Sequence, residues 1–116
     1  MPSPPLRDTE VTPEQAQQAL TDGSALVVDV REDYEWDAGR IEGAEHIELT
    51  QLPARAEELP RDRTIIFVCR VGARSAMAAD ALGRAGFDAR TMRGGMVRWD
   101  DEGRPMAPEG GTVAPH

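Results

Sequence analysis

The stretch "TIIFVCRVGARSAMAADALGRAGF", residues 64–87, carries the clearest strand, loop and helix of the chain. Residues 64–69 form an almost wholly apolar run rich in β-branched residues, which is typical of a strand covered on both faces. From Arg74 onward apolar residues recur at helical spacing, and Gly86 stands where a helix stop belongs. The recurring positions are Met77, Ala78, Ala81, Leu82 and Ala85. A strand, a short loop and a helix in this order predict an α/β unit.

A second strand of the same kind is predicted upstream, at "ALVVDV", residues 25–30. It follows a predicted helix whose start is well marked. Thr12 suits the N-cap, Pro13 suits the first helical position, and Gln15 can close a capping box. Gly23 then ends this helix. We therefore expect the helix to lead directly into a buried strand.

Shorter elements are predicted between and after these segments. They are a helical turn at 33–38, a strand at 46–49, a helix at 52–59, a strand at 90–92, and a short amphipathic piece that follows two glycines and ends at Trp99. Strands that alternate with helices predict an α/β fold with a mainly parallel central sheet of about five strands, flanked by helices on both faces. We place one domain at 10–104, between flexible Pro- and Gly-rich segments at 1–9 and 105–116.

Composition narrows the function. A chain of 116 residues suits one domain and therefore one site. A net charge of −8 argues against nucleic acid as a partner, because nucleic-acid binders concentrate positive charge on one face. All 13 basic residues are arginine, which excludes a Schiff-base lysine and a lysine-containing phosphate loop. With neither a leader peptide nor an apolar run long enough to cross a bilayer, no membrane association is expected, and we expect a cytoplasmic protein.

Cys69 is the residue to which this pattern directs attention. It is the only cysteine, so no internal disulfide explains it, and it ends the most hydrophobic predicted strand. Ligands of such folds bind beyond the carboxyl ends of the strands. The following loop contains Gly72, which can take a positive φ, and leads into a helix start whose free N–H groups favour negative charge. We expect these amides and two nearby arginines to stabilise a Cys69 thiolate. The alternative is a buried cysteine that acts as a small hydrophobe.

Three segments resemble one known family, the rhodanese-type sulfurtransferases. "CRVGARS", residues 69–75, is similar to their active-site loop, Cys-x-x-Gly-x-Arg-Ser. "VVDVREDYEWDAGRIEGAEHI", residues 27–47, resembles a second signature, an Asp-x-Arg followed by Gly-x-Ile-x-Gly-Ala. "GGMVRW", residues 94–99, is similar to the closing Gly-Gly helix with its tryptophan. The resemblance spans residues 10–104 and implies a rhodanese-like fold.

The resemblance also implies a reaction and a set of site residues. Cys69 would be the catalytic nucleophile, taking sulfur from thiosulfate or from a persulfide donor and passing it to a thiol or to cyanide. The rest of the loop would bind the substrate, with Arg74 and Arg70 holding an incoming anion. These loop residues are Arg70, Val71, Gly72, Ala73, Arg74 and Ser75. No metal and no organic cofactor is expected for this chemistry.

Related phosphatases resemble this architecture but place five residues between cysteine and arginine. Here four residues separate Cys69 from Arg74, and the smaller ring favours sulfur over a phosphoryl group. Asp29 and Arg31 match a family motif, and we interpret them as a structural charge pair, with a functional role as the alternative. His46 and His116 lack the partners of a metal site in the sequence pattern. Tyr34, Trp36 and Trp99 are expected to pack around the loop.

Three functions are compatible with these observations. The first is an enzyme that acts on thiosulfate or a related sulfane donor. The second is a carrier module that exchanges sulfur with a protein donor or acceptor and has little small-molecule activity. The third is a non-catalytic interaction domain, which the intact loop disfavours.

Overall fold

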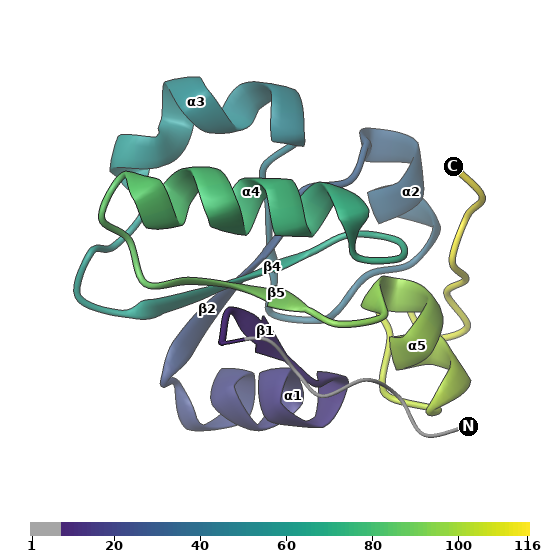
Figure 1. The fold of residues 1–116 in the computed structure, drawn as a ribbon. Coiled ribbons are helices and arrows are strands. Elements are labelled where there is room, and N and C mark those ends of the chain that lie inside the picture. The colour runs from purple at the N-terminus through teal and green to yellow at the C-terminus, as the bar shows by residue number, and fades with distance from the viewer. Residues whose placement is uncertain (1–7) are drawn as a thin grey trace.

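The computed structural model describes residues 8–116, and Figure 1 shows how they fold. The elements in chain order are β1 (Glu10–Val11), α1 (Pro13–Asp22), β2 (Ala25–Asp29), α2 (Asp33–Ala38), β3 (Glu45–His46), α3 (Leu52–Arg55), β4 (Thr64–Val68), α4 (Ala73–Arg84), β5 (Ala89–Met92) and α5 (Gly95–Asp101). Two 3₁₀ turns, Leu49–Gln51 and Ala56–Glu58, flank α3.

The five strands form one sheet in the order β1-β5-β4-β2-β3, and all neighbouring strands run parallel. The two strands that the sequence predicts as buried on both faces, β2 and β4, lie side by side near the centre, with Ala25 opposite Thr64 and Asp29 opposite Val68. This confirms the predicted α/β fold. The short strand β1 was not predicted, because two residues carry no detectable pattern, and its partner is β5 at the edge of the sheet.

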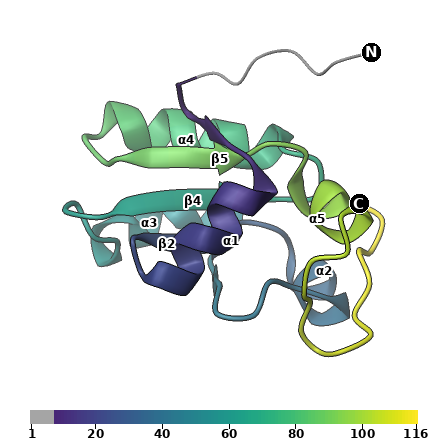
Figure 2. The same cartoon turned by 90° about the horizontal axis from the view of Figure 1, so that it is seen from below.

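Helices cover both faces of the sheet, with α3 and α4 on one side and α1 and α5 on the other (Figures 1 and 2). Successive residues of β4 serve the two cores in turn. Ile65 and Phe67 pack with the α3 and α4 side, and Ile66 and Val68 pack with the α1 and α5 side. Each of these buried side chains contributes roughly 1.5–3 kcal/mol relative to exposure. Because both faces are buried, the strand reads as a continuous apolar run.

The helix boundaries largely follow the predicted signals. In α1 the Gln15 N–H donates to Thr12 Oγ1 at 3.1 Å, and the Thr12 N–H donates to the Gln15 side chain at 2.9 Å, which confirms the capping box. Gly23 ends the helix with φ 77°. Two boundaries differ from expectation. The strand predicted at 46–49 is limited to Glu45–His46, and the helix predicted at 52–59 gives way to a 3₁₀ turn after Arg55.

The buried face of α4 differs from the apolar spacing that predicted the helix. Met77 is 64% exposed, whereas Ala78, Ala79 and Leu82 face the core. Ser75, a polar residue, belongs to the same buried face. The loop that precedes the helix explains this rotation, because it turns Ser75 inward toward Cys69. The residues that follow Ser75 at intervals of three, four and seven are then buried with it.

The C-terminal segment, which the sequence predicts as a flexible tail from residue 105, packs against the domain. Arg40 and Ala107 form an antiparallel bridge with N–H to O distances of 2.9 and 2.8 Å. The Thr112 N–H donates to the Ala38 carbonyl, and Met106 and Val113 pack against the α1 and α5 core. Proline and glycine prevent regular secondary structure here, yet an irregular backbone can still pair with carbonyls that α2 leaves free. Residue 104 is therefore not the end of the packed structure.

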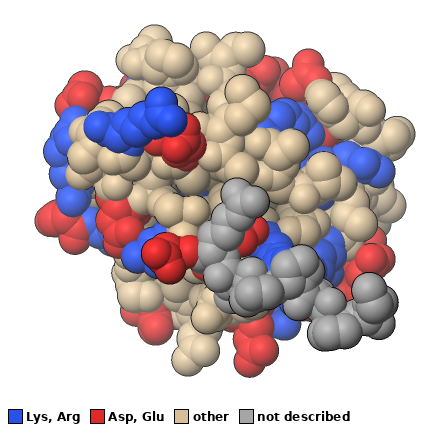
Figure 3. All heavy atoms as spheres, viewed as in Figure 1, with Lys and Arg blue, Asp and Glu red and all other residues tan. Residues whose placement is uncertain are grey.

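The flexible N-terminal segment predicted at 1–9 lies mostly outside the described residues. Of the part that is described, Thr9 accepts a hydrogen bond from the Thr91 N–H at 2.8 Å, which extends the pairing of β1 with β5. On the face shown in Figure 3, acidic and basic side chains are interspersed and form no continuous basic patch. Among the described residues, no helix is long and apolar enough to cross a membrane.

Candidate active site

The candidate site lies beyond the carboxyl ends of the parallel strands, where α/β folds bind ligands. Cys69 follows β4, Arg31 follows β2 after one residue, and Gly94 and Gly95 follow β5. Because β4 lies between β2 and β5, the loop after β4 is central at this edge. The sheet topology therefore brings together three segments that are far apart in the sequence.

The Cys69 sulfur is surrounded by donors from its own loop. The residue is 1% exposed, and its Sγ accepts hydrogen bonds from the Gly72 N–H at 3.1 Å and the Ser75 N–H at 3.4 Å. The Ser75 Oγ lies 3.5 Å from the same sulfur. Gly72 has φ 110°, which turns the chain back toward the cysteine and begins α4. The predicted convergence of amides on the sulfur is thus present.

Helix α5 fixes the other side of this loop. The Met96 N–H donates to the Cys69 carbonyl at 2.9 Å, and the Val97 N–H donates to the Arg70 carbonyl at 3.0 Å. Gly95 makes this approach possible, because a Cβ there would overlap both of those carbonyl oxygens, and its φ of 58° also favours glycine. The closing double glycine therefore serves the loop that carries the cysteine.

Arg74 is held by a carboxylate that the sequence did not single out. Its two terminal nitrogens donate to the Glu35 oxygens at 2.7 and 2.9 Å, a bidentate pair. Glu35 is fully buried on α2, and its Oε1 also accepts from the Glu32 N–H at 3.0 Å. Burial by itself would raise the pKa of Glu35, but these hydrogen bonds and the positive charge of Arg74 outweigh burial and hold the pKa below its ordinary value. The same pair raises the pKa of Arg74.

This pairing bears on the role expected for Arg74. The sequence suggests a guanidinium that receives an incoming anion, but both terminal nitrogens bond to Glu35, which neutralises the charge. Arg70 is the other cation of the loop. Among the described residues its side chain has no ion pair, and its Nε is buried without a hydrogen-bond partner. Of the remaining predicted loop residues, Val71 is 53% exposed and Ala73 is exposed at the start of α4.

Asp29 and Arg31 form a buried pair beneath the loops. Arg31 Nε donates to both Asp29 oxygens, at 2.9 and 3.0 Å, and Nη2 donates to Asp29 Oδ2 at 2.7 Å and to the Gly39 carbonyl at 2.8 Å. Neither side chain is more than 2% exposed. These contacts join the end of β2 to the turn after α2, as a structural charge pair would. They are consistent with the structural interpretation of both residues.

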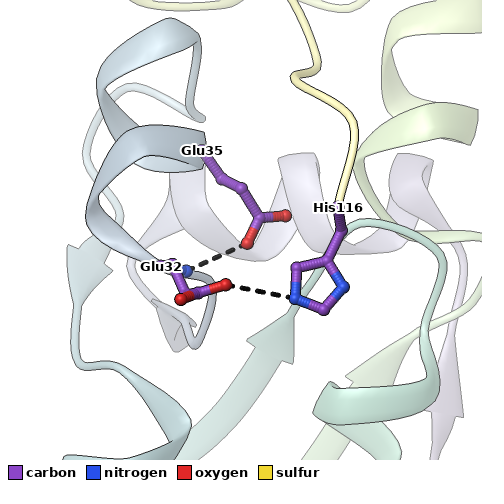
Figure 4. Close-up of side chains that lie close together, drawn as sticks. All are labelled: Glu32, Glu35 and His116. Atoms are coloured by element: carbon purple, nitrogen blue, oxygen red, sulfur yellow. Dashed lines mark hydrogen bonds and ion pairs between the residues drawn. The ribbon is translucent and has the colours of Figure 1, made fainter.

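The two histidines have more partners than the sequence suggests. His46 stacks on Trp36 with ring centroids 4.7 Å apart, and His116 Nε2 lies 3.2 Å from Glu32 Oε2. His116, Glu32 and Glu35 bring one potential metal-ligand atom each within 4.8 Å of the others (Figure 4). Both Glu35 oxygens already bond to Arg74, however, so this cluster offers only two exposed ligands. It does not form a metal centre of the usual three or four ligands.

The aromatic residues divide between core and rim. Trp99 is 2% exposed, packs in the core with Met96 and donates from Nε1 to the Pro105 carbonyl at 2.9 Å. Tyr34 is half exposed, and its hydroxyl donates to the Pro115 carbonyl at 3.2 Å. The C-terminal segment thus contacts α2 close to Glu35.

Comparison with known proteins identifies the family. A model of the rhodanese-like domain matches residues 12–102. The chain belongs to the rhodanese-like domain family. A sulfurtransferase of Allochromatium vinosum is 36% identical over 104 residues, which cover 87% of this chain and 97% of that protein. The crystal structure of a rhodanese-related protein from Thermoplasma volcanium superimposes with a TM-score of 0.80 at 28% identity, covering 86% of this chain and 98% of that one.

A further relative shows the domain as part of a larger protein. A tRNA sulfurtransferase of Desulfurococcus amylolyticus is 31% identical over 77 residues, 66% of this chain but only 15% of that protein. The family and its sulfurtransferase relatives identify this rhodanese-like domain as a sulfur-transferring enzyme. The resemblance of the three motifs is therefore confirmed at the level of family and fold.

Two residues of the site escaped the sequence analysis. Glu35 lies within the 27–47 segment, but a glutamate in an exposed-looking helical turn gives no sign that it is buried. Thr91 lies in β5, and its Oγ1 is 2.7 Å from Ser75 Oγ. No local pattern marks a threonine in a strand as a partner of a residue 16 positions away.

Proposed function

We propose that the domain carries sulfane sulfur as a persulfide on Cys69 and transfers it to a thiol or to cyanide. The observation that supports this proposal is the set of donors around a buried sulfur that no other chemistry of the chain explains. Two loop N–H groups donate to Sγ, and the Ser75 hydroxyl, which accepts from the protonated thiol at 3.5 Å, can donate to the sulfur once it is ionised. Such donors stabilise negative charge on sulfur without a metal ion or cofactor.

The reaction has two balanced half-steps. The Cys69 thiolate attacks the outer sulfur of thiosulfate, an S–S bond forms, and the bond to the sulfonate sulfur breaks with its electron pair leaving on sulfite. Cyanide or a thiolate then attacks the outer sulfur of the persulfide. The S–S bond breaks, its electron pair returns to Cys69, and thiocyanate or a new persulfide is released.

Arg70 is the residue we assign to the anionic donor. Its charge is not neutralised by a carboxylate among the described residues, whereas Arg74 is fully engaged by Glu35. Arg74 instead holds the start of α4 against α2. Since Ser75 follows Arg74 directly, this anchor also positions the Ser75 N–H that points at the sulfur.

The test is the intact mass of the reduced protein after incubation with thiosulfate. We expect an added mass of about 32 Da that cyanide removes, because a persulfide is a reversible cap on a thiolate. The matched control is Cys69→Ala, which should gain nothing while keeping its far-UV circular dichroism. A cyanide-labile sulfur on the Ala variant, or no added mass with any sulfane donor, would contradict the proposal.

A second candidate is transfer from a protein persulfide, with thiosulfate a poor donor. Beside Arg74 lies a hollow of about 290 Å³ whose wall includes the Glu32 and Glu48 side chains. Partial desolvation and the neighbouring Asp33 carboxylate raise the pKa of Glu48, a sign of crowded negative charge. A donor that approached the loop past this wall would meet these carboxylates, which would repel the thiosulfate dianion more than a persulfide on a partner protein, because that persulfide carries less charge.

The two candidates are separated by the sulfur donor and by two variants that each remove one charge. If small-molecule transfer is the main activity, loading by thiosulfate should be complete at low millimolar concentration, and Arg70→Ala should slow it. If a protein donates the sulfur, thiosulfate should load slowly, and Glu48→Gln should accelerate loading because one repelling charge is lost. Loading by thiosulfate that neither variant changes would remove the electrostatic argument for both.

A further inference from the structure

A chain of two hydroxyl groups connects the Cys69 sulfur to β5. Ser75 Oγ lies 3.5 Å from Cys69 Sγ and 2.7 Å from Thr91 Oγ1. Ser75 is fully buried and Thr91 is 5% exposed. A hydrogen bond of 2.7 Å between two buried hydroxyls is short and well shielded from water, so its direction affects the groups it joins.

The number of protons determines that direction. Each hydroxyl has one proton to donate. Ser75 Oγ also lies 3.2 Å from the Gly72 carbonyl, so its proton has three possible acceptors: the sulfur, that carbonyl and Thr91. Within the described residues, the Thr91 hydroxyl has no acceptor besides Ser75 Oγ. If Ser75 donated to Thr91, the Thr91 proton would be buried without a partner, which costs about 1–3 kcal/mol.

Thr91 therefore donates to Ser75, and Ser75 is left to donate to the sulfur or to the Gly72 carbonyl. The Gly72 carbonyl already accepts from the Ala76 N–H at 3.0 Å, so it keeps a partner when Ser75 turns away. The protonated Cys69 thiol donates to Ser75 Oγ, whereas the ionised sulfur can only accept. The thiolate is then the preferred acceptor of the Ser75 proton, because hydrogen bonds to charged groups are roughly twice as strong as neutral ones.

We propose that Thr91 is a positioning residue that orients the Ser75 hydroxyl toward the Cys69 thiolate. It does not touch the sulfur, and it acts by occupying a Ser75 lone pair, so that the Ser75 proton points at the charge. The inference rests on the proposed function for its role in turnover, because the free thiolate is both the attacking group of the first half-step and the leaving group of the second.

The experiment uses Cys69 as its own reporter. It is the only cysteine, so alkylation by iodoacetamide measured from pH 5 to 10 follows one thiolate. We expect Thr91→Val to shift the midpoint of the rate profile upward and to lower the rate roughly two- to fourfold at pH values below the midpoint. Thr91→Ser keeps a hydroxyl and should retain the wild-type midpoint. If the Val variant folds poorly, Thr91→Ala provides the same loss of donor.

Two controls separate orientation from packing. Thr64→Val removes the hydrogen bond of 2.6 Å that the Thr64 hydroxyl donates to Asp88 Oδ2. Thr64 lies at the opposite end of β4 from Cys69, so this variant should leave the pH profile of alkylation unchanged. On a Ser75→Ala background, Thr91→Val should have no further effect on the midpoint, because its action passes through Ser75. A pure packing effect would alter the limiting rate at high pH and leave the midpoint in place.

The outcomes distinguish this inference from the proposed function. Wild-type protein that accepts sulfur, together with a Thr91→Val midpoint equal to that of wild type, overturns the role of Thr91 alone. If the Thr91→Val midpoint shifts but the wild-type protein accepts no sulfur from any donor, the orienting role of Thr91 is supported and the proposed function is overturned. If Thr91→Val shifts the midpoint further on the Ser75→Ala background, the orienting role is also overturned, because Thr91 would then act without Ser75.

Discussion

Replacing Arg74 by methionine should destabilise the fold far more than a change in a binding loop would. Glu35 is fully buried, and both of its oxygens bond to Arg74, which is itself only 18% exposed at its side chain. Methionine fills much of the same volume but leaves a buried carboxylate without its cation. Breaking a buried pair by removing one partner costs about 3–5 kcal/mol. For a domain of this size the loss corresponds to a fall in Tm of roughly 12–20 °C.

The assay is urea unfolding followed by circular dichroism, which gives the free energy of unfolding and its denaturant slope. The double variant Glu35→Gln with Arg74→Met removes both charges and should lie within about 1–2 kcal/mol of wild type, because no unpaired charge stays buried. Asp80→Asn is the matched control. It removes one partner of the exposed pair Asp80–Arg84, whose side chains are 64% and 80% exposed, and should cause no measurable change.

The pH dependence of the free energy of unfolding provides a second test. In the wild type the folded pKa of Glu35 lies below the ordinary 4.5, so its stabilisation is complete above that value and is lost as pH falls through the lowered folded pKa. In Arg74→Met the buried carboxyl has lost its cation, so burial raises its pKa. The penalty should therefore shrink as pH falls toward 4.5. A loss below about 1 kcal/mol for Arg74→Met would refute the reasoning. So would a double variant whose loss of stability equals the sum of the losses of Arg74→Met and Glu35→Gln measured separately.

Two further changes test how the loop and the C-terminal segment are held. Gly95→Ala should lower the free energy of unfolding by about 1–3 kcal/mol or more and slow alkylation of Cys69, because the added Cβ overlaps the carbonyls of the loop. The control for backbone strain is Gly103→Ala, since Gly103 has a similar φ of 70° but open space around it. Equal losses in the two variants would show that the structure relieves the overlap at Gly95. Met106→Ala should lower stability by about 1–2 kcal/mol in thermal unfolding, since Met106 packs against the core. The control is Met77→Ala, which should leave the Tm unchanged because Met77 is exposed. If Met106→Ala has the same Tm as Met77→Ala, the C-terminal segment adds no stability.

The sequence alone was sufficient for the elements whose signals are local. The apolar runs of β2 and β4, the capping box of α1 and the glycine that ends that helix all depend on neighbours within a few residues. The loop from Cys69 to Ser75 is also local, because one glycine turn followed by a helix start directs N–H groups back at the preceding residue. The position of the sulfur among amide donors could therefore be predicted.

The charge balance of the site could not be predicted in this way. Arg74 has the same residue type and spacing whether it binds an anion or a carboxylate of its own chain. The carboxylate comes from Glu35, 39 residues earlier, and reaches Arg74 only because β2 and β4 are neighbours in the sheet. Likewise the contact of Thr91 with Ser75 depends on the pairing of β4 with β5.

The C-terminal segment shows the same division. Its proline and glycine content predicts a flexible tail, but composition does not reveal which free carbonyls lie nearby. Those carbonyls belong to Ala38, the last residue of α2, and to Arg40, two residues later. The sequence determined what each local segment can form, because backbone preferences act over a few residues. Only the tertiary structure decided which charges, hydroxyls and carbonyls meet, because those contacts depend on the order of strands in the sheet.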